Sequence, residues 1–591
     1  MYTELKSYQI IIRLLKEYEI RHLVLSPGAR NVPFVHSVEE DDFFTCYSVV
    51  DERSAGYFAL GLSQELGEPV VISCTSSTAA CNYWPPVAEA YYQGVPLVVL
   101  TSDRDPQMLG HREDQMIDQV GMYDRHIKKS VNLPIVKDDD DFLCCARLVN
   151  EALLELNHRG TGPVHINVPM KYYSTSFTAN ELPEVRKIDR FCLSDDKALW
   201  DAMLDELLRS KRILVVCGQQ SRPTQGLLDA LQRFAKASGC AVAVEHMSNV
   251  DIEGSFNSSV CFDTHYVSDK KFSELLPDIV VSFGGNVMSG IKAMLRRDCG
   301  KFEHWLVQED GAICDLFKSL RNVFECTPEE FFSRAAERAG ASTGDTAYRD
   351  ALLAYAGAVE MPEFPWSNVC AIRSLLARVQ VGSIVHASIN SAIRISNFFE
   401  LTEGVTFYAN IGTYGIDGCL SSFLGQSVAS PDRRCYLIVG DLSFFYDMNA
   451  LRIRHYGSNV RIMLLNNHGG EEFYYNGMWQ NEKSDLHTTA RHADTAKAWV
   501  ESRGFRYLTA SSKEELDSQM GTFCGDSDAP VFLEVFSEMS TDAKVIGDFY
   551  DLSRPRDLVS EAKRKGKEFV KSTVGKETAL KVAGKLGIDL R

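Results

Sequence analysis

Short apolar runs rich in β-branched residues recur along the chain, and helical patterns separate them. In the first part of the chain these runs begin at His22, Pro69, Pro96 and Val164. Each run is continuous rather than alternating, which is typical of a strand buried on both faces of a parallel sheet. Helical stretches over 54–65 and 79–92 lie between them. This alternation predicts an α/β fold of doubly wound parallel sheets.

The chain is too long for a single domain. Its 591 residues predict several domains, and a charge-rich segment near 180–195 and a linker around 340–368 divide it. We expect doubly wound domains at 1–182, 195–345 and 366–552, followed by a helical tail at 553–591. The lysine-rich pattern of the tail favours a solvated surface helix over a functional basic arm. The first and third domains share their order of strands and helices, which indicates related folds.

Composition and charge argue against two classes of partner. The net charge of −18 disfavours nucleic acid, because phosphate binding requires a basic surface. No run of 18 apolar residues is present, so no membrane span is expected, and the N-terminal sequence lacks the apolar core of a secretory signal. Sixteen cysteines occur without CxxC pairs, and Cys217, Cys240 and Cys435 lie in apolar runs. We expect reduced core thiols in a cytoplasmic protein.

Two clusters of small polar residues follow predicted strands in the third domain. The first is Gly440-Asp441-Leu442-Ser443, and the second is Asn466-Asn467-His468-Gly469-Gly470. A helical run is expected between them, over 447–456. An acidic residue after one strand and small ligands after the next form a site for a divalent cation, which can hold a diphosphate. The alternative is two ordinary strand-to-helix turns, which favour the same residue types.

Several longer motifs resemble one family of thiamine-diphosphate enzymes. The motifs are Ser26-Pro27-Gly28-Ala29-Arg30, the stretch that begins Asp51-Glu52-Arg53, Thr101-Ser102-Asp103-Arg104, Gly415-Ile416-Asp417-Gly418 and Gly440-Asp441-Leu442-Ser443. Together they resemble the 2-succinyl-5-enolpyruvyl-6-hydroxy-3-cyclohexene-1-carboxylate synthases of menaquinone biosynthesis, the MenD family. The motifs keep the family's order in the first and third domains, so the resemblance covers nearly the whole chain.

The resemblance implies a pyrimidine-binding domain, a middle domain and a diphosphate-binding domain. It also implies thiamine diphosphate and Mg²⁺, or another divalent cation, as cofactors. In this superfamily the cofactor lies between the first domain of one subunit and the third domain of another. A homodimer is then the smallest functional unit, and a homotetramer is common. Flavin is not expected, because the MenD branch does not need it.

The resemblance also assigns residues of the cofactor site. Glu52 matches the catalytic glutamate, whose carboxyl hydrogen-bonds the aminopyrimidine ring and promotes loss of the thiazolium proton. Its alternative role is a favourable charge at the start of a helix. Ile416 matches the bulky apolar residue beneath the cofactor. The diphosphate loop matches Gly440, Asp441, Leu442, Ser443, Gly469 and Gly470.

Asp441, His468 and Gly470 match the metal ligands of the family, and Gly470 would bind through its carbonyl. His468 stands where the family has asparagine, and a neutral imidazole is a poorer ligand for Mg²⁺ than an amide oxygen. Three outcomes are open at this position. His468 binds the metal and favours a softer ion, Asn467 binds in its place, or metal binding is weakened.

The expected substrate contacts are basic or polar. The residues that match those used by the family on anionic substrates are Arg30, Arg104, Gln115 and Arg394. Other positions depart from the family: Ile411 replaces an arginine, and Ile291-Lys292 replaces a Lys-Arg pair. Glu471 and Glu472 add negative charge after the Gly-Gly pair, and Ser77 stands where glycine is usual. Each lost charge-assisted contact costs about 1.5–3 kcal/mol, so we expect a relative with a changed substrate.

The leading hypothesis is a thiamine-diphosphate- and metal-dependent enzyme that decarboxylates a 2-oxo acid and transfers the acyl carbanion to an acceptor. Both substrates would be small molecules. One alternative is the MenD reaction itself, with 2-oxoglutarate and isochorismate, and another is a simple 2-oxo acid decarboxylase. A catalytically silent homologue, retained for assembly or regulation, is a third. Glu52 and Asp441 argue against this last alternative, whereas His468 leaves it open.

Overall fold

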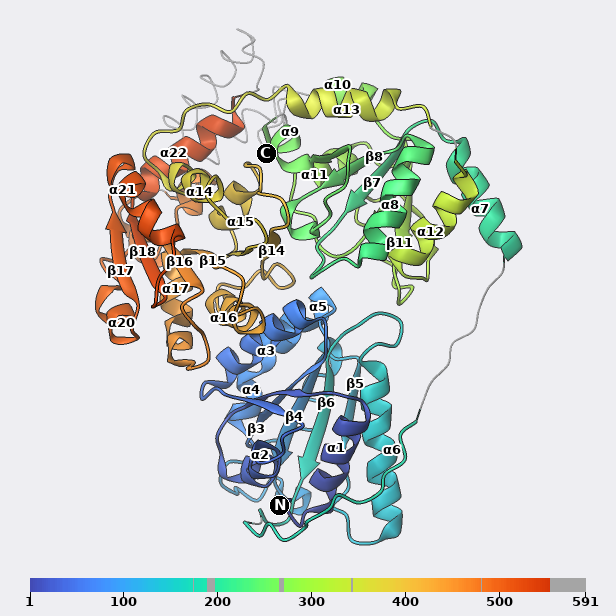
Figure 1. Cartoon of the computed structure of the whole chain (residues 1–591), viewed down its shortest axis with the longest axis vertical. Helices are drawn as coiled ribbons and strands as arrows, with labels where there is room; N and C mark the ends of the chain where they lie inside the picture. The colour runs from blue at the N-terminus through green and yellow to red at the C-terminus, as the bar shows by residue number, and fades with distance from the viewer. Residues whose placement is uncertain (174, 189–196, 265–269, 342–343, 480, 553–591) are drawn as a thin grey trace, which may run out of the picture.

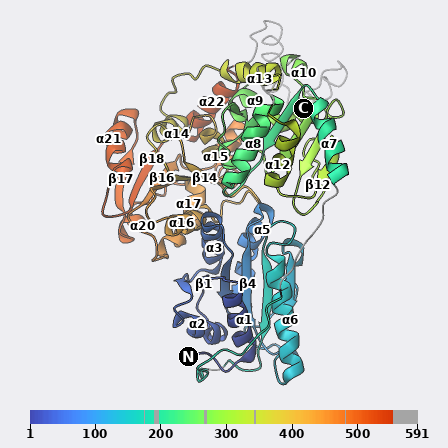
Figure 2. The ribbon, with the colours of Figure 1, turned by 45° about the vertical axis from the view of Figure 1, so that its right-hand side comes forward.

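Three six-stranded sheets, each with all its strands parallel, form the framework of the chain. The computed structural model describes residues 1–173, 175–188, 197–264, 270–341, 344–479 and 481–552. Helices cover both faces of each sheet, and the middle and third domains lie above the first in Figures 1 and 2. The predicted fold class is confirmed. The domain boundaries stay a prediction, and the expected tail helix at 553–591 lies outside the described residues.

The first sheet has the strand order β2-β1-β3-β4-β6-β5. Its strands are β1 (His22–Leu25), β2 (Thr45–Ser48), β3 (Val70–Cys74), β4 (Leu97–Asp103), β5 (Lys129–Asn132) and β6 (Val164–Pro169). Its helices are α1 (Lys6–Glu17), α2 (Val32–Glu39), α3 (Glu52–Leu66), α4 (Thr78–Asn82), α5 (Trp84–Gln93) and α6 (Asp139–Glu155). Helix α3 begins where the Asp51 side chain accepts the Ser54 amide proton, and it ends at Gly67, whose φ is 71°.

The third sheet repeats this order as β14-β13-β15-β16-β18-β17. Its strands are β13 (Ile384–Ala387), β14 (Thr406–Tyr408), β15 (Cys435–Gly440), β16 (Val460–Asn466), β17 (Arg506–Ala510) and β18 (Val531–Phe536). The larger helices around it are α14 (Asn368–Leu376), α15 (Ser391–Ser396), α16 (Cys419–Ala429), α17 (Asp441–Asp447), α20 (Lys497–Ser502), α21 (Lys513–Cys524) and α22 (Met539–Tyr550). The shorter ones are η5 (Met448–Arg452), α18 (Glu472–Tyr475) and α19 (Lys483–His487). The shared order supports the expected relation between the first and third domains.

The middle sheet has a different order, β12-β11-β10-β7-β8-β9. Its strands are β7 (Ile213–Cys217), β8 (Ala241–Val244), β9 (Ser255–Asn257), β10 (Ile279–Phe283), β11 (Glu303–Val307) and β12 (Leu320–Phe324). Its helices are α7 (Lys197–Arg209), α8 (Gln225–Ser238), α9 (Ser258–Thr264), α10 (Lys270–Glu274), α11 (Ile291–Arg297), α12 (Pro328–Ala339) and α13 (Ala347–Gly357). The strand order reverses between β7 and β10, where open α/β sheets often bind ligands.

Side chains from the middle domain bind the third domain at this reversal. The Gln219 amide donates to the Ala409 carbonyl over 2.8 Å, and the Asn286 amide donates to the Ile411 carbonyl over 2.6 Å. Gly218 and Gly285 lie so close that a side chain on Gly218 would overlap the Gly285 carbonyl. The reversal point is therefore filled by protein contacts.

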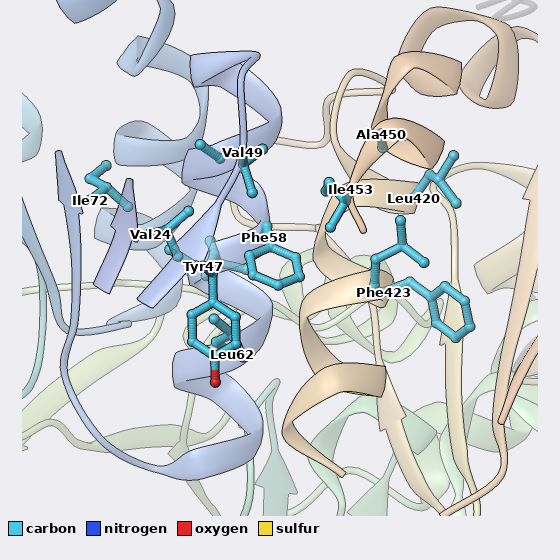
Figure 3. Packing of buried hydrophobic residues seen from close by; sticks show 14 of the residues in the cluster. Val24, Tyr47, Val49, Phe58, Leu62, Ile72, Leu420, Phe423, Ala450 and Ile453 are labelled. Atoms are coloured by element: carbon cyan, nitrogen blue, oxygen red, sulfur yellow. The ribbon is translucent and has the colours of Figure 1, made fainter. Parts of the chain in front are cut away.

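Helices α3 and α16 join the first and third domains. Their side chains belong to one hydrophobic cluster that runs from the first sheet into the third, and Figure 3 shows Phe58 on one side of it and Leu420 and Phe423 on the other. Glycines allow the close approach, because a Cβ on Gly61 would overlap the Ser422 carbonyl. The carboxylate of Glu65 accepts from Arg433 over 2.6 Å and from the Tyr408 hydroxyl over 2.7 Å. The two domains thus share a core.

Three local expectations differ from the structure. The helix expected over 447–456 begins earlier, at Asp441, and continues only as the short helix η5. The stretch 79–92 is broken at Tyr83, because Pro85 and Pro86 follow and cannot donate backbone hydrogen bonds. The linker expected around 340–368 contains helix α13, whose apolar side chains pack on the core of the middle domain.

The cysteines agree with the expectation of buried thiols. Cys217, Cys240 and Cys435 are buried free thiols, and all the cysteines in the described segments are free. Within the same segments, no helix has the length and apolar character needed to cross a membrane. The cytoplasmic location stays a prediction.

Candidate functional site

The two polar clusters of the third domain meet at the carboxyl edge of its sheet. Asp441 follows β15 directly and opens helix α17. One of its carboxylate oxygens accepts the Gly469 amide proton over 2.9 Å, and the other accepts that of Leu442 over 2.6 Å. The Ser443 hydroxyl donates to the Ile416 carbonyl over 2.9 Å. Residues expected to share the diphosphate and metal site therefore lie together.

The turn after β16 leaves a ring nitrogen of His468 unpaired. His468 has a φ of 71°, and its ring stacks on Phe536 with 6.1 Å between centroids. Its Nδ1 atom is buried and has no hydrogen-bond partner among the described residues. The NH2 group of the neighbouring Asn467 side chain donates to Glu471 over 2.6 Å and to Asp542 over 3.0 Å.

This donor set fits a divalent cation. Asp441 supplies a carboxylate, His468 supplies an imidazole nitrogen without another partner, and Gly470 supplies a carbonyl. A preformed group of three or more His, Cys, Asp or Glu ligands does not occur in the described segments, and the Gly470 carbonyl stays a predicted ligand.

Two residues of this edge were missed by sequence reasoning. The Nε2 atom of His492 lies 3.3 Å from the Asp441 carboxylate, which raises the pKa of His492. The Ser388 hydroxyl accepts the Gly440 amide proton over 3.2 Å. His492 lies in an irregular segment before α20 and Ser388 follows β13, and neither belongs to a motif that could have indicated it.

Glu471 is buried inside the third domain. Its side chain is 5% exposed and accepts from the amides of Asn368 and Asn467 over 2.8 and 2.6 Å. Burial and then the neighbouring Asp542 carboxyl raise the pKa of Glu471 well above its usual range. The glutamate expected to repel an anionic acceptor is therefore held inside the third domain, in a setting that favours its neutral form.

Glu472 and Arg394 lie near one another on the side that faces the middle domain. Burial raises the pKa of Glu472, and the positive charge of Arg394 opposes this shift. Burial raises the pKa of Asp263 to about 7, with the Gly290 amide and Arg394 acting in the opposite direction. Arg394 thus has acidic neighbours from the middle domain and from the third domain. Ile411, which stands where the family has arginine, is 2% exposed and packs in the core of the third domain.

The expected substrate residues of the first domain form a second group. Arg30 donates to the Gln115 side chain over 2.7 Å, and Gln115 donates to the Ser76 carbonyl over 3.4 Å. Burial and the neighbouring Arg104 lower the pKa of Arg30, so the two guanidinium groups are close. Arg104 also pairs with Glu113 over 2.7 Å.

Ser77 adopts a backbone conformation that glycine occupies readily. Its φ is 74° and its ψ is −126°, a combination that strains residues with a Cβ. The Gln119 side chain accepts its amide proton over 2.7 Å and holds the turn in place. This explains why glycine is expected at the position and indicates that the serine is tolerated at a cost in stability.

Glu52 belongs to the first-domain group. It is the first residue of α3, is half-buried, and accepts from the Asn82 amide over 3.2 Å. Across the described part of the chain, no hydrogen bond or ion pair joins Glu52 to Asp441, Ser443 or His468. One chain therefore carries two separate groups of expected site residues, one on each domain.

Comparisons with known proteins agree with this arrangement. Residues 5–122 match the thiamine pyrophosphate enzyme N-terminal TPP binding domain, and residues 390–535 match the C-terminal TPP binding domain. A 2-succinyl-5-enolpyruvyl-6-hydroxy-3-cyclohexene-1-carboxylate synthase of Bacteroides fragilis is 38% identical over 93% of this chain and 99% of its own.

Synthases of the same name from Bacteroides thetaiotaomicron and Christiangramia forsetii are 36% and 31% identical. These matches cover 93% and 94% of this chain and 99% and 100% of the relatives. Similarity at this level extends over all three sheets. The chain therefore belongs to the MenD family of thiamine-diphosphate-dependent enzymes.

Proposed function

We propose that this chain decarboxylates a 2-oxo acid and transfers the acyl unit to a small-molecule acceptor, using thiamine diphosphate and a divalent cation. The contact that carries the proposal joins the Gly469 amide to the Asp441 carboxylate. It brings the two motifs of the third domain into one cradle, beside the unpaired Nδ1 atom of His468. This arrangement favours an enzyme over a silent homologue, because a polar atom left buried and unpaired is costly without a ligand.

Each expected residue has a role in this proposal. Asp441, His468 and the Gly470 carbonyl hold the cation, and Ser443 and the amides near it face the diphosphate. The Glu52 carboxyl would hydrogen-bond the pyrimidine ring of the cofactor, and Ile416 would fix the shape of the cofactor. Thiamine diphosphate, when bound, supplies the electron sink for decarboxylation. The first-domain group of Arg30, Arg104 and Gln115, together with Arg394, orients anionic substrate groups.

The placement of the two groups on different domains supports a homodimer. Glu52 and Asp441 share no hydrogen bond or ion pair within the described chain, and a complete site would combine the first domain of one copy with the third domain of another. We propose a dimer as the minimum assembly, with a tetramer as the alternative. Sedimentation with thiamine diphosphate and Mg²⁺ should give at least a dimer, and an active monomer would contradict this arrangement.

The MenD reaction itself is the second candidate. The family comparisons favour it, and so does the inward position of Glu471, which removes one of the reasons for expecting a changed substrate. The buried Ile411 and the acidic neighbours of Arg394 still favour a different acceptor or donor. Product formed from 2-oxoglutarate and isochorismate would establish the second candidate over the first.

Carbon dioxide release with a panel of 2-oxo acids tests the proposal. We expect release to require both thiamine diphosphate and a divalent metal. Glu52→Gln should reduce release by at least about a hundredfold, the usual size of a proton-transfer contribution. Glu68→Gln is the matched control, because Glu68 is an exposed carboxyl just after the same helix. Release by Glu52→Gln at the control rate would refute the role of Glu52.

A further inference from the structure

A cavity of about 470 Å³ lies at the junction of the first and third domains, outside the two groups described above. One wall is the turn from β2 into α3, and the other is the segment between η5 and β16 together with Arg503. Figure 3 shows Val49 on the first-domain side of this junction and Ile453 on the third-domain side. Both residues line the cavity and are 3% exposed. Its volume falls within the usual range for small-molecule sites.

Hydrogen bonds across the junction hold the two walls together. The Asn449 amide donates to the Asp51 carboxylate over 2.9 Å, and the Ser48 amide donates to Nε2 of His455 over 2.9 Å. His455 therefore uses this nitrogen as an acceptor, and burial lowers its pKa, so the ring is neutral near pH 7. The cavity has a fixed apolar floor and polar, cross-linked sides.

The charge on the walls is predominantly positive. Arg452, Arg454 and Arg503 line the cavity, and none of them forms an ion pair with an acidic residue in the described segments. Arg503 contacts the Trp499 ring and the Ser502 hydroxyl. The single carboxylate on the wall, Asp51, is already bonded to Asn449 and to the Ser54 amide. Three unpaired arginines are notable in a chain whose net charge is −18.

We propose that this cavity binds a small anion that carries two or more negative charges on phosphate or carboxylate groups. Guanidinium groups bind both through paired, charge-assisted hydrogen bonds, and the three arginines on the third-domain wall attract such a ligand. Asp51 caps helix α3, and Glu52 is its first residue. The bound anion would lie against the turn that precedes Glu52, and none of the expected substrate or cofactor residues lines the cavity.

Calorimetric titration of the full chain tests the proposal. Thiamine diphosphate and Mg²⁺ are present at saturation, and NaCl keeps the ionic strength constant. Inorganic phosphate and citrate are the two probes. We expect at least one of them to bind saturably, and the double variant Arg452→Gln/Arg454→Gln to weaken that binding by at least about tenfold. Binding of phosphate alone would assign a phosphorylated ligand, and binding of citrate alone would assign a polycarboxylate.

Arg321→Gln is the control variant, since Arg321 is an exposed arginine of the middle domain that pairs with Glu303. It should bind the probes as the unmodified protein does. Equal affinity in the control and in the double variant would overturn the proposal, and so would heats of injection that do not saturate with either probe. Circular dichroism and the unfolding temperature show that the double variant is folded. The titration does not measure carbon–carbon bond formation, so its failure is distinct from failure of the proposed function.

Discussion

The joint between α3 and α16 leads to a quantitative prediction for Gly61→Ala. The new methyl group would lie 2.8 Å from the carbonyl carbon of Ser422 and 3.1 Å from its Cα. Carbon atoms pack best at about 3.5–4.0 Å, and the Ser422 carbonyl oxygen would lie closer still, so the helices must separate by at least about 1 Å. Overpacking of this kind costs about 1–3 kcal/mol, and replacing a helical glycine recovers about 0.5–1 kcal/mol. Because the overlap is with backbone atoms, which cannot rotate away, we expect a net loss in the upper part of the resulting range, about 1–2.5 kcal/mol.

Thermal unfolding of the full chain measures this loss. A change of about 1 kcal/mol shifts the midpoint by roughly 2–4 °C in a domain of 150–250 residues. Gly521→Ala is the matched control, because Gly521 lies in helix α21 and a Cβ added there would meet no atom within 4 Å. The control should be slightly more stable than the unmodified protein. A Gly61→Ala variant as stable as the Gly521→Ala variant would refute the close approach of the two helices.

Three further substitutions have definite expected outcomes. Ser77 has a strained φ of 74°, and such a conformation costs about 1–3 kcal/mol. Ser77→Gly should relieve this strain and raise the unfolding midpoint, and a lower midpoint would contradict the strain. Burial raises the pKa of Asp447 to about 7, although the Ser421 amide, which donates to its carboxylate, acts in the opposite direction. The contribution of Asp447 to stability is therefore complete below its unfolded pKa and is lost as the pH rises through 7. Asp447→Asn should flatten the fall in stability between about pH 4 and 7, measured by urea unfolding across that range. His468→Asn should lower the Mg²⁺ concentration needed for half-maximal cofactor binding by up to about tenfold, a change of about 1.4 kcal/mol; an unchanged Mg²⁺ requirement would show that His468 is not a ligand.

The fold was predictable because its strands are buried on both faces. The runs after His22, Pro69 and Cys435 are continuous and apolar, and each became a parallel strand. The residues of the third-domain cradle were predictable because strands in a parallel sheet end at the same edge. Asp441 and Gly469 are 28 residues apart in sequence and bonded in space.

Other features depend on contacts that local patterns do not contain. The helix after β15 begins at Asp441 because that residue lies at the strand's end, whereas the apolar pattern indicated a later start. His492 reaches Asp441 from an irregular segment. Glu471 was expected to add negative charge after two glycines, but Asn467 of the same turn and Asn368 and Asp542 from two other segments surround it. Tertiary packing therefore turns the Glu471 side chain into the third domain.

The hydrogen bonds from Gln219 and Asn286 restrict how this enzyme could be recombined with others. They support the carbonyls of Ala409 and Ile411, and the chain runs from there directly to Ile416. A chimera that received a foreign middle domain would lose both supports unless the donor carried amides at the two positions. Such a chimera could keep all three sheets intact and still bind its cofactor poorly.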